Sequence, residues 1–161
     1  MNFEACVAVI LYHEGGYVND SNDPGGETRF GISKRSFPNV NIKELTLEHA
    51  KDLYRRYYWD MCECDKLPDW ARLIVFDCAV NQGVPRAVID LQRISGSKPD
   101  GIIGPKTLER VFDMEPTDFI GEYAMKRFGR YYSNPRWKHF GGGWAKRLLD
   151  ITVRSYTYLV A

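Results

Sequence analysis

The stretch DWARLIVFDCAVN, residues 69–81, is the most continuously apolar part of the chain and decides its architecture. It predicts a helix that is apolar around most of its circumference, with Pro68 at its start and Gly83 as its stop. Because such a helix has almost no face to offer to water, we expect it to be the central helix, on which the other elements pack.

Helical patterns also occupy most of the sequence on either side of this segment. Residues 17–40 are the exception, because they are rich in Gly, Pro, Asn, Asp and Ser and contain short apolar pieces typical of turns and a small β-hairpin. The fold class predicted is therefore α+β, mostly α, with one small β-hairpin near the N-terminus. Apolar periodicity, prolines, caps and glycines predict the other helices over 3–14, 46–59, 85–94, 105–112 and 116–132, with a last one from 144 toward the end.

The composition is that of one folded domain. The chain has 161 residues, of which 44% are hydrophobic and 27% charged, so it can bury a sizeable core and is neither disordered nor a serial multidomain protein. No apolar run approaches the roughly 20 residues that cross a bilayer, so no stable membrane insertion is expected. The first residues lack the basic region and the cleavage site of a signal peptide, which predicts storage in a cytosol.

The cysteines and histidines indicate no metal or organic cofactor. Cys62 and Cys64 form a C-x-C pair without the usual zinc-ligand spacing, and the three histidines are scattered. Cys6 and Cys78 stand alone in the sequence, and in a reducing cytosol all four cysteines are expected to be free thiols. Phosphate-binding glycine loops and nucleophilic serine motifs are also missing from the sequence.

Charge is distributed unevenly along the chain. Residues 1–125 carry 14 basic and 20 acidic residues, whereas residues 126–161 carry 8 basic residues and one acidic residue. Aromatic residues are interleaved with the cations of the second segment, a pattern that suits a polyanionic surface, a nucleic acid or a groove for sugars. The alternative is a packed helical pair with a solvated cationic face.

A dense polar segment follows the first predicted helix. Glu14 stands at the C-terminal end of that helix, where the negative end of the helix dipole disfavours the charged carboxylate, as a general acid requires. Cleavage of a glycosidic bond needs such an acid and a second polar group across the sugar, and Asp23 and Thr28 could supply it. The alternative is that Glu14 merely flanks a helix stop and that the other two residues stabilise turns.

Short motifs are spread along the chain. They are Glu14-Gly-Gly-Tyr17, Asp23-Pro-Gly-Gly-Glu-Thr28-Arg-Phe-Gly-Ile32, Tyr57-Tyr-Trp-Asp60, Phe76-Asp-x-Ala-Val-Asn81-x-Gly83, Asp100-Gly-Ile-Ile-Gly104 and Trp144-x-x-Arg147. Together these motifs resemble glycoside hydrolase family 108, the lysozyme-like muramidases found in bacteriophage endolysins and bacterial autolysins. The resemblance covers nearly the full chain, and its later part is similar to the peptidoglycan-binding lobe usually paired with that family.

The resemblance implies a single lysozyme-like domain over residues 1–161. Within it, residues 1–68 would form the catalytic lobe with the hairpin, and residues 69–161 a helical lobe with the peptidoglycan-binding resemblance. The activity implied is hydrolysis of the β-1,4 bond between N-acetylmuramic acid and N-acetylglucosamine in bacterial peptidoglycan.

The resemblance also implies roles for individual residues. Glu14 corresponds to the catalytic glutamate of the family. Its spacing to Asp23 and Thr28 is similar to the Glu, Asp and Thr triad of phage-type lysozymes, in which the threonine helps to hold the water. Asp20 remains a rival for the second carboxylate. Inversion or retention depends on the separation of the two carboxyl groups.

Other residues are candidates for substrate binding, each with a structural alternative. Asp77 and Asn81 lie four apart on the central helix, which suits a role at a cleft or in structural hydrogen bonding. Tyr58 could stack on a sugar, although consecutive helical positions cannot all face one cleft. Tyr17 would exclude water near Glu14. The substrate-binding candidates are therefore Tyr17, Asp20, Tyr58, Asp77 and Asn81.

The partner implied is the glycan strand of bacterial peptidoglycan, bound by a monomer without nucleic acid. An endolysin without a signal peptide would wait in the host cytoplasm until a holin releases it to act on the wall in the periplasm. Two other classes stay open. One is a chitinase or lytic transglycosylase on a similar scaffold, and the other is a non-catalytic wall-binding or phage structural protein.

Overall fold

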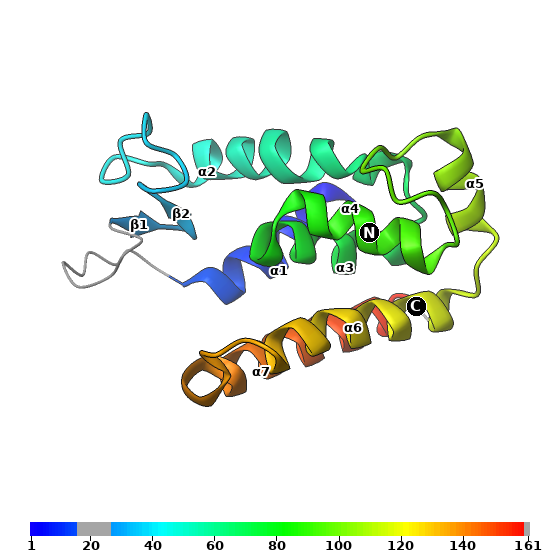
Figure 1. Cartoon of the computed structure of the whole chain (residues 1–161). Coiled ribbons are helices and arrows are strands. Elements are labelled where there is room, and N and C mark those ends of the chain that lie inside the picture. The colour runs from blue at the N-terminus through cyan, green and yellow to red at the C-terminus, as the bar shows by residue number, and fades with distance from the viewer. Residues whose placement is uncertain (16–26, 160–161) are drawn as a thin grey trace.

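A computed structural model describes residues 1–15 and 27–159 of the chain (Figure 1). It confirms the predicted fold class, mostly helical with a two-stranded antiparallel sheet near the N-terminus. The elements in these residues are α1 (Phe3–Glu14), β1 (Thr28–Arg29), β2 (Ile32–Ser33), α2 (Leu47–Tyr54), η1 (Arg55–Trp59), η2 (Asp60–Cys62), η3 (Cys64–Lys66), α3 (Asp69–Gln82), α4 (Val84–Ile94), α5 (Pro105–Phe112), α6 (Pro116–Tyr132) and α7 (Trp137–Thr157).

The central helix is α3, as its apolar sequence predicts. Most of its side chains are buried, and it packs against α1, α4, α6 and α7. Phe76 of α3 contacts Phe3 of α1 and Trp59 of η1, with ring centroids 6.1 and 5.3 Å apart. In Figure 1 the hairpin and α2 lie on one side of α1 and α3, and the antiparallel pair of α6 and α7 lies on the other.

The helix predicted over 46–59 changes its winding halfway. Thr46 caps α2 by accepting a hydrogen bond from the backbone N–H of His49. From Arg55 the chain continues as the π-helical turn η1, closed by an N–H···O bond from Asp60 to Arg55. A π-helical turn holds more residues than an α-helical one and so rotates the following side chains. Here it buries Trp59 completely while Tyr57 stays exposed and Tyr58 half-buried.

The last helix begins seven residues earlier than the sequence predicts, at Trp137 instead of Trp144. Three consecutive glycines at 141–143 indicate a break, yet they lie inside α7. The Trp137 ring packs directly over Gly141, because a Cβ placed there would lie 2.5–2.8 Å from three atoms of that ring. Trp137 also contacts Phe128 and Tyr132 of α6 edge-on. Aromatic packing between the two helices therefore overrides the low helix propensity of glycine.

The four cysteines are free and buried: Cys6, Cys62, Cys64 and Cys78. Burial raises the pKa of the Cys6 thiol to about 12, so this thiol stays protonated and unreactive near neutral pH. Among the described residues, no helix combines the length and the apolar character that crossing a bilayer requires.

Because Trp137 contacts Gly141, alanine substitutions at the neighbouring positions Gly141 and Gly142 should change the free energy of unfolding in opposite directions. Gly142→Ala meets nothing within 4 Å, so it should raise the free energy of unfolding by up to about 1 kcal/mol through helix propensity. Gly141→Ala should lower it, because the new methyl group displaces the Trp137 ring. Urea unfolding of both variants measures the difference, and equal stabilisation by both would contradict the packing described here.

Candidate active site

Glu14 is the last residue of α1, and the hairpin turn lies directly on its side chain. The turn residues Phe30 and Gly31 have φ angles of 52° and 76°, the left-handed conformation of a tight hairpin, and the register pairs Thr28 with Ser33. A Cβ on Gly31 would lie 2.6 Å from Cγ of Glu14 and would also collide with the Tyr54 hydroxyl. Glycine is therefore required here both for its conformation and for this close approach.

Tyr54 fastens the hairpin in this position. Its hydroxyl donates a hydrogen bond of 2.8 Å to the carbonyl oxygen of Phe30. Burial, reinforced by the charge of Glu14, raises the pKa of Tyr54 well above its usual value, so the hydroxyl remains a donor. The end of α1, the hairpin and α2 thus form one fixed wall around Glu14.

An arginine of α7 holds Glu14 from the other side. Nη1 of Arg147 donates to Oε1 of Glu14 at 2.6 Å, and the side chain of Glu14 is 20% exposed. The same guanidinium donates from Nε to Oδ1 of Asp77 at 2.9 Å. Burial of Arg147 lowers its pKa, but the charges of Asp77 and Glu14 outweigh burial and raise it above the usual value, so Arg147 is a permanent cation.

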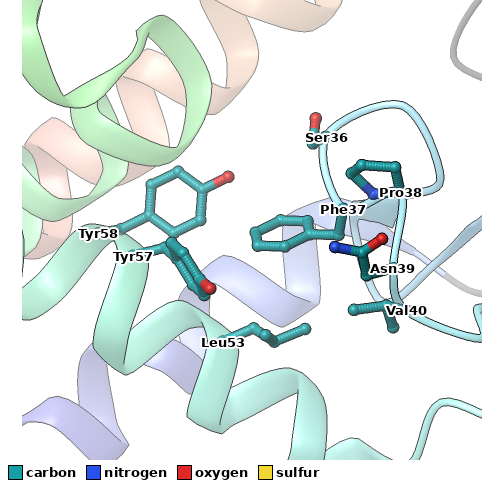
Figure 2. Close-up of a pocket in the computed structure, with 8 residues that line it drawn as sticks. All are labelled: Ser36, Phe37, Pro38, Asn39, Val40, Leu53, Tyr57 and Tyr58. Carbon is teal, nitrogen blue, oxygen red and sulfur yellow. The ribbon is translucent and has the colours of Figure 1, made fainter.

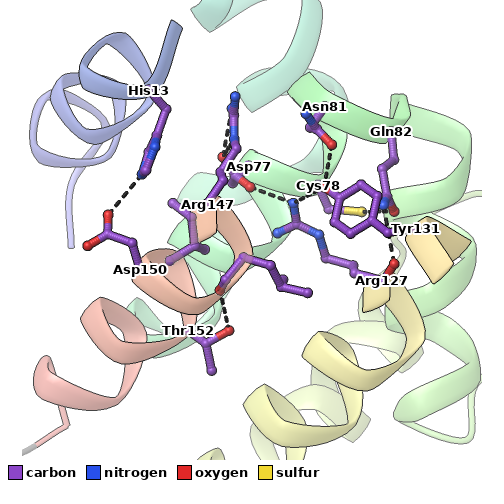
Figure 3. Close-up of polar contacts among 12 residues, drawn as sticks. His13, Asp77, Cys78, Asn81, Gln82, Arg127, Tyr131, Arg147, Asp150 and Thr152 are labelled. Carbon is purple, nitrogen blue, oxygen red and sulfur yellow. Dashed lines mark hydrogen bonds and ion pairs between the residues drawn. The ribbon is translucent and has the colours of Figure 1, made fainter. Parts of the chain in front are cut away.

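Asp77 is completely buried on α3 and binds two arginines (Figure 3). Its Oδ2 accepts from Nη2 of Arg127 on α6 at 2.5 Å, and Oδ1 accepts from Arg147. Burial alone would raise the pKa of Asp77, but the two guanidinium groups outweigh burial and hold it below its usual range. This geometry matches the structural alternative for Asp77, because its carboxylate is enclosed by arginines and unavailable to a substrate.

A pocket rich in aromatic side chains lies between α2, η1 and the segment that follows β2. This aromatic pocket has a volume of about 360 Å³. Figure 2 shows Phe37 and Tyr58 pointing toward each other across it. Burial and the charge of Glu14 raise the pKa of Tyr58, so its hydroxyl stays protonated. The lining residues are Ser36, Phe37, Pro38, Asn39, Val40, Leu53, Tyr57 and Tyr58.

A second, polar pocket of about 180 Å³ lies on the α7 side. Asn81 lines it and accepts a hydrogen bond from the hydroxyl of Tyr131. Trp144 lines it as well and stacks on the Tyr131 ring, with centroids 5.4 Å apart. The lining residues are Asn81, Gln82, Arg86, Arg130, Tyr131, Asn134 and Trp144.

The residues singled out in the sequence have different places in the structure. Glu14, Tyr58 and Asn81 lie at or beside the site, and Thr28 is half-buried on β1 of the hairpin that covers Glu14. Tyr17, Asp20 and Asp23 lie outside the described residues.

Sequence reasoning missed the role of the arginines. Arg147 is part of a quoted motif, but nothing in its spacing points to Glu14, which is 133 residues away. Arg127 lies within a basic helix, where a solvated cation is the ordinary expectation, and yet its side chain is fully buried. The uncompensated carboxylate at Asp77 on an apolar helix was the one available signal that a cation must lie nearby.

The described residues contain no group of three or more His, Cys, Asp or Glu side chains close enough to hold a metal ion. They present a partly exposed carboxylate that is held by a permanent cation. A carboxyl group that is fixed and partly exposed can exchange a proton with a bound molecule.

Comparison with known proteins gives a family and a structural relative. Residues 7–83 match the family described as Glycosyl hydrolase 108. The solved structure of SagA from Brucella abortus is 32% identical in sequence, with a TM-score of 0.88 over 96% of this chain and 94% of that chain. No curated protein matches the chain.

Replacement of the buried carboxylate tests the charge network. Asp77→Asn leaves Arg127 buried without its counter-ion, which should lower the free energy of unfolding at pH 7 by about 3 kcal/mol. Because the folded pKa of Asp77 is depressed, its stabilisation is full above the unfolded value near 3.8 and is lost as pH falls through the folded value. The difference between wild type and variant should therefore shrink below about pH 4.

Urea unfolding from pH 7 to pH 3 measures this dependence. Asp52→Asn is the matched control, because Asp52 is an exposed carboxylate on α2 and makes no ion pair within the described part of the chain. It should change stability by less than about 0.5 kcal/mol at every pH. A difference between wild type and Asp77→Asn that stayed constant with pH would contradict the ionised state of Asp77.

Proposed function

This chain belongs to glycosyl hydrolase family 108, and from that premise we propose that it cleaves the β-1,4 bond between N-acetylmuramic acid and N-acetylglucosamine with Glu14 as general acid. Membership makes the protein a glycoside hydrolase of a lysozyme-like family that acts on peptidoglycan. The choice of bond and the role of Glu14 are the parts that we propose.

One observation carries the role of Glu14. Its side chain is 20% exposed, is anchored by Arg147 at 2.6 Å, and stands between the hairpin turn at Gly31 and α7. A general acid must reach the leaving oxygen of the sugar and must not rotate away from it. The hairpin turn at Gly31 and the guanidinium of Arg147 restrict the side chain from two directions.

In the proposed reaction Glu14 donates its proton to the glycosidic oxygen as the bond breaks. The product of that transfer is a carboxylate, which Arg147 stabilises through a charge-assisted hydrogen bond, an effect opposite to the one expected from the helix dipole alone. Arg147 is thus a positioning residue, and Asp77 in turn orients Arg147. Breaking the network at Asp77 would loosen the acid without touching the substrate.

A second polar group is needed across the sugar ring. We propose Asp23 for it, with Asp20 as the rival carboxylate and Thr28 as the group that helps to hold the water. Support comes from Thr28, which lies on β1 in the same hairpin that covers Glu14. Tyr58 in the aromatic pocket is proposed to stack on a sugar, since it lines that pocket.

The endolysin role, release by a holin and action in the periplasm remain predictions from the sequence resemblance. The same is true of the monomeric state and of the division into lobes at residue 68.

The proposal predicts that Glu14→Gln abolishes hydrolysis while the fold persists. The substitution keeps the shape of the side chain and removes the transferable proton, so the rate should fall by about 10²–10⁴-fold. The measurement is turbidity clearing of outer-membrane-permeabilised Gram-negative cells, with mass analysis of the released sugar ends and circular dichroism as the check of folding.

Glu4→Gln is the matched control, because Glu4 lies on the same helix, is exposed, and pairs only with Lys51 within the described residues. It should clear cells at the wild-type rate. Equal clearing by Glu14→Gln would place the acid elsewhere. Anhydro-muramic ends would indicate a lytic transglycosylase, and binding to sacculi without release of sugar ends would indicate a wall-binding protein.

A further inference from the structure

We propose that the polar pocket binds a carboxylate of the peptide stem on muramic acid, so that the enzyme selects peptide-bearing glycan over bare glycan. This inference rests on the proposed function and extends it to the specificity of the same groove. The residues that carry it are Arg86, Asn81 and the rigid wall formed by Tyr131 and Trp144.

The polar pocket begins one helical turn away from the Glu14–Arg147 pair. Trp144 precedes Arg147 by three residues on α7, which is about 4.5 Å along the helix axis. Asn81 follows Asp77 by four residues on α3, about 6 Å along that axis. Since Arg147 also binds Glu14, we infer that a sugar held at the acid carries its substituent toward the pocket.

The pocket offers an uncommitted positive charge. Arg130 is already occupied, since it donates to Asp90 and to Gln82. Arg86, in contrast, makes no ion pair or side-chain hydrogen bond in residues 1–15 and 27–159, and it lies exposed in the first turn of α4. A guanidinium without a partner at the rim of a pocket is suited to a carboxylate, which it can bind through two parallel hydrogen bonds.

The walls of the pocket are held in place before any ligand arrives. Trp144 is stacked between Tyr131 and Phe140, at centroid distances of 5.4 and 6.0 Å. The Tyr131 hydroxyl donates to Oδ1 of Asn81 and accepts from Arg127 at 3.3 Å. This pairing directs the amide oxygen of Asn81 to the tyrosine and leaves its NH₂ group as a donor.

The chemistry of the substrate supplies a matching anion. Chitin carries hydroxyl and acetamido groups but no carboxylate. In peptide-bearing peptidoglycan the lactyl carboxyl group of muramic acid is bound as an amide, and the peptide presents its own carboxylates several bonds beyond the sugar. Removal of the peptide by an amidase leaves one carboxylate, the lactyl group, directly on the sugar. The polar pocket has half the volume of the aromatic pocket, which suits an amino-acid carboxylate better than a sugar ring. These features assign a sugar to the aromatic pocket and the peptide to the polar pocket.

The test compares one peptidoglycan preparation before and after removal of its stem peptides by an amidase. We expect wild type to show a higher kcat/KM on the peptide-bearing form, and Arg86→Gln to lower the ratio of the two kcat/KM values about tenfold. Arg93→Gln is the matched control, because Arg93 is exposed on the same helix and lies outside the pocket, and it should leave the ratio unchanged.

An unchanged ratio in Arg86→Gln, or an equal loss on both substrates, would overturn the proposal. Calorimetric binding of muramyl dipeptide to the intact protein, with the carboxyl group of its peptide free or amidated, gives a readout that does not depend on cleavage. If wild type binds the free acid more tightly than the amide and Arg86→Gln does not, the result supports carboxylate recognition by the pocket. This conclusion holds even if wild type cleaves neither polymer, because a lack of cleavage contradicts only the proposed function. Equal binding of the acid and the amide would refute carboxylate recognition.

Discussion

The buried ion pair between Asp77 and Arg127 is the constraint on which the rest of the structure depends. Removing two charges from water costs several kcal/mol for each ion, and this cost is recovered only if both partners stay in place. Two nitrogen atoms of Arg127, Nε and Nη1, have no acceptor in the described part of the chain, so Asp77 supplies most of its compensation. The pair therefore fixes α6 against α3, and Arg147 extends the same network to α7 and to Glu14.

This network explains why a site can exist at the end of α1. The helix ends at Glu14, with Gly15 as its cap, and a lone carboxylate at a helix end would rotate freely. Arg147 holds it from the α7 side and the turn at Gly31 closes from the hairpin side, since only glycine fits against Cγ of Glu14. Preorganisation of this kind is what general acid catalysis requires, because the acid must be aimed before the substrate arrives.

Local signals in the sequence were sufficient for most of the helices. Pro105 and Pro116 predict the first residues of α5 and α6, because proline is preorganised for the first turn and lacks an N–H that would have no partner. The same local reasoning failed at α7, where Gly141 looks like a stop but accommodates the Trp137 ring. It also failed at η1, because a π-helical turn has no characteristic amino-acid composition. Here the turn accompanies the burial of Trp59.

The sequence by itself determined the helical class, the central position of α3, the hairpin and the candidacy of Glu14, since each depends on periodicity, turn chemistry or short motifs within a few residues. Only the tertiary structure decided which charges meet. Glu14 and Arg147, like Asp77 and Arg127, are joined by packing across many residues of chain, and their pairing follows from the cost of burying an uncompensated charge. A local sequence pattern cannot reveal this cost, because the cost arises only when the helices pack around the carboxylate.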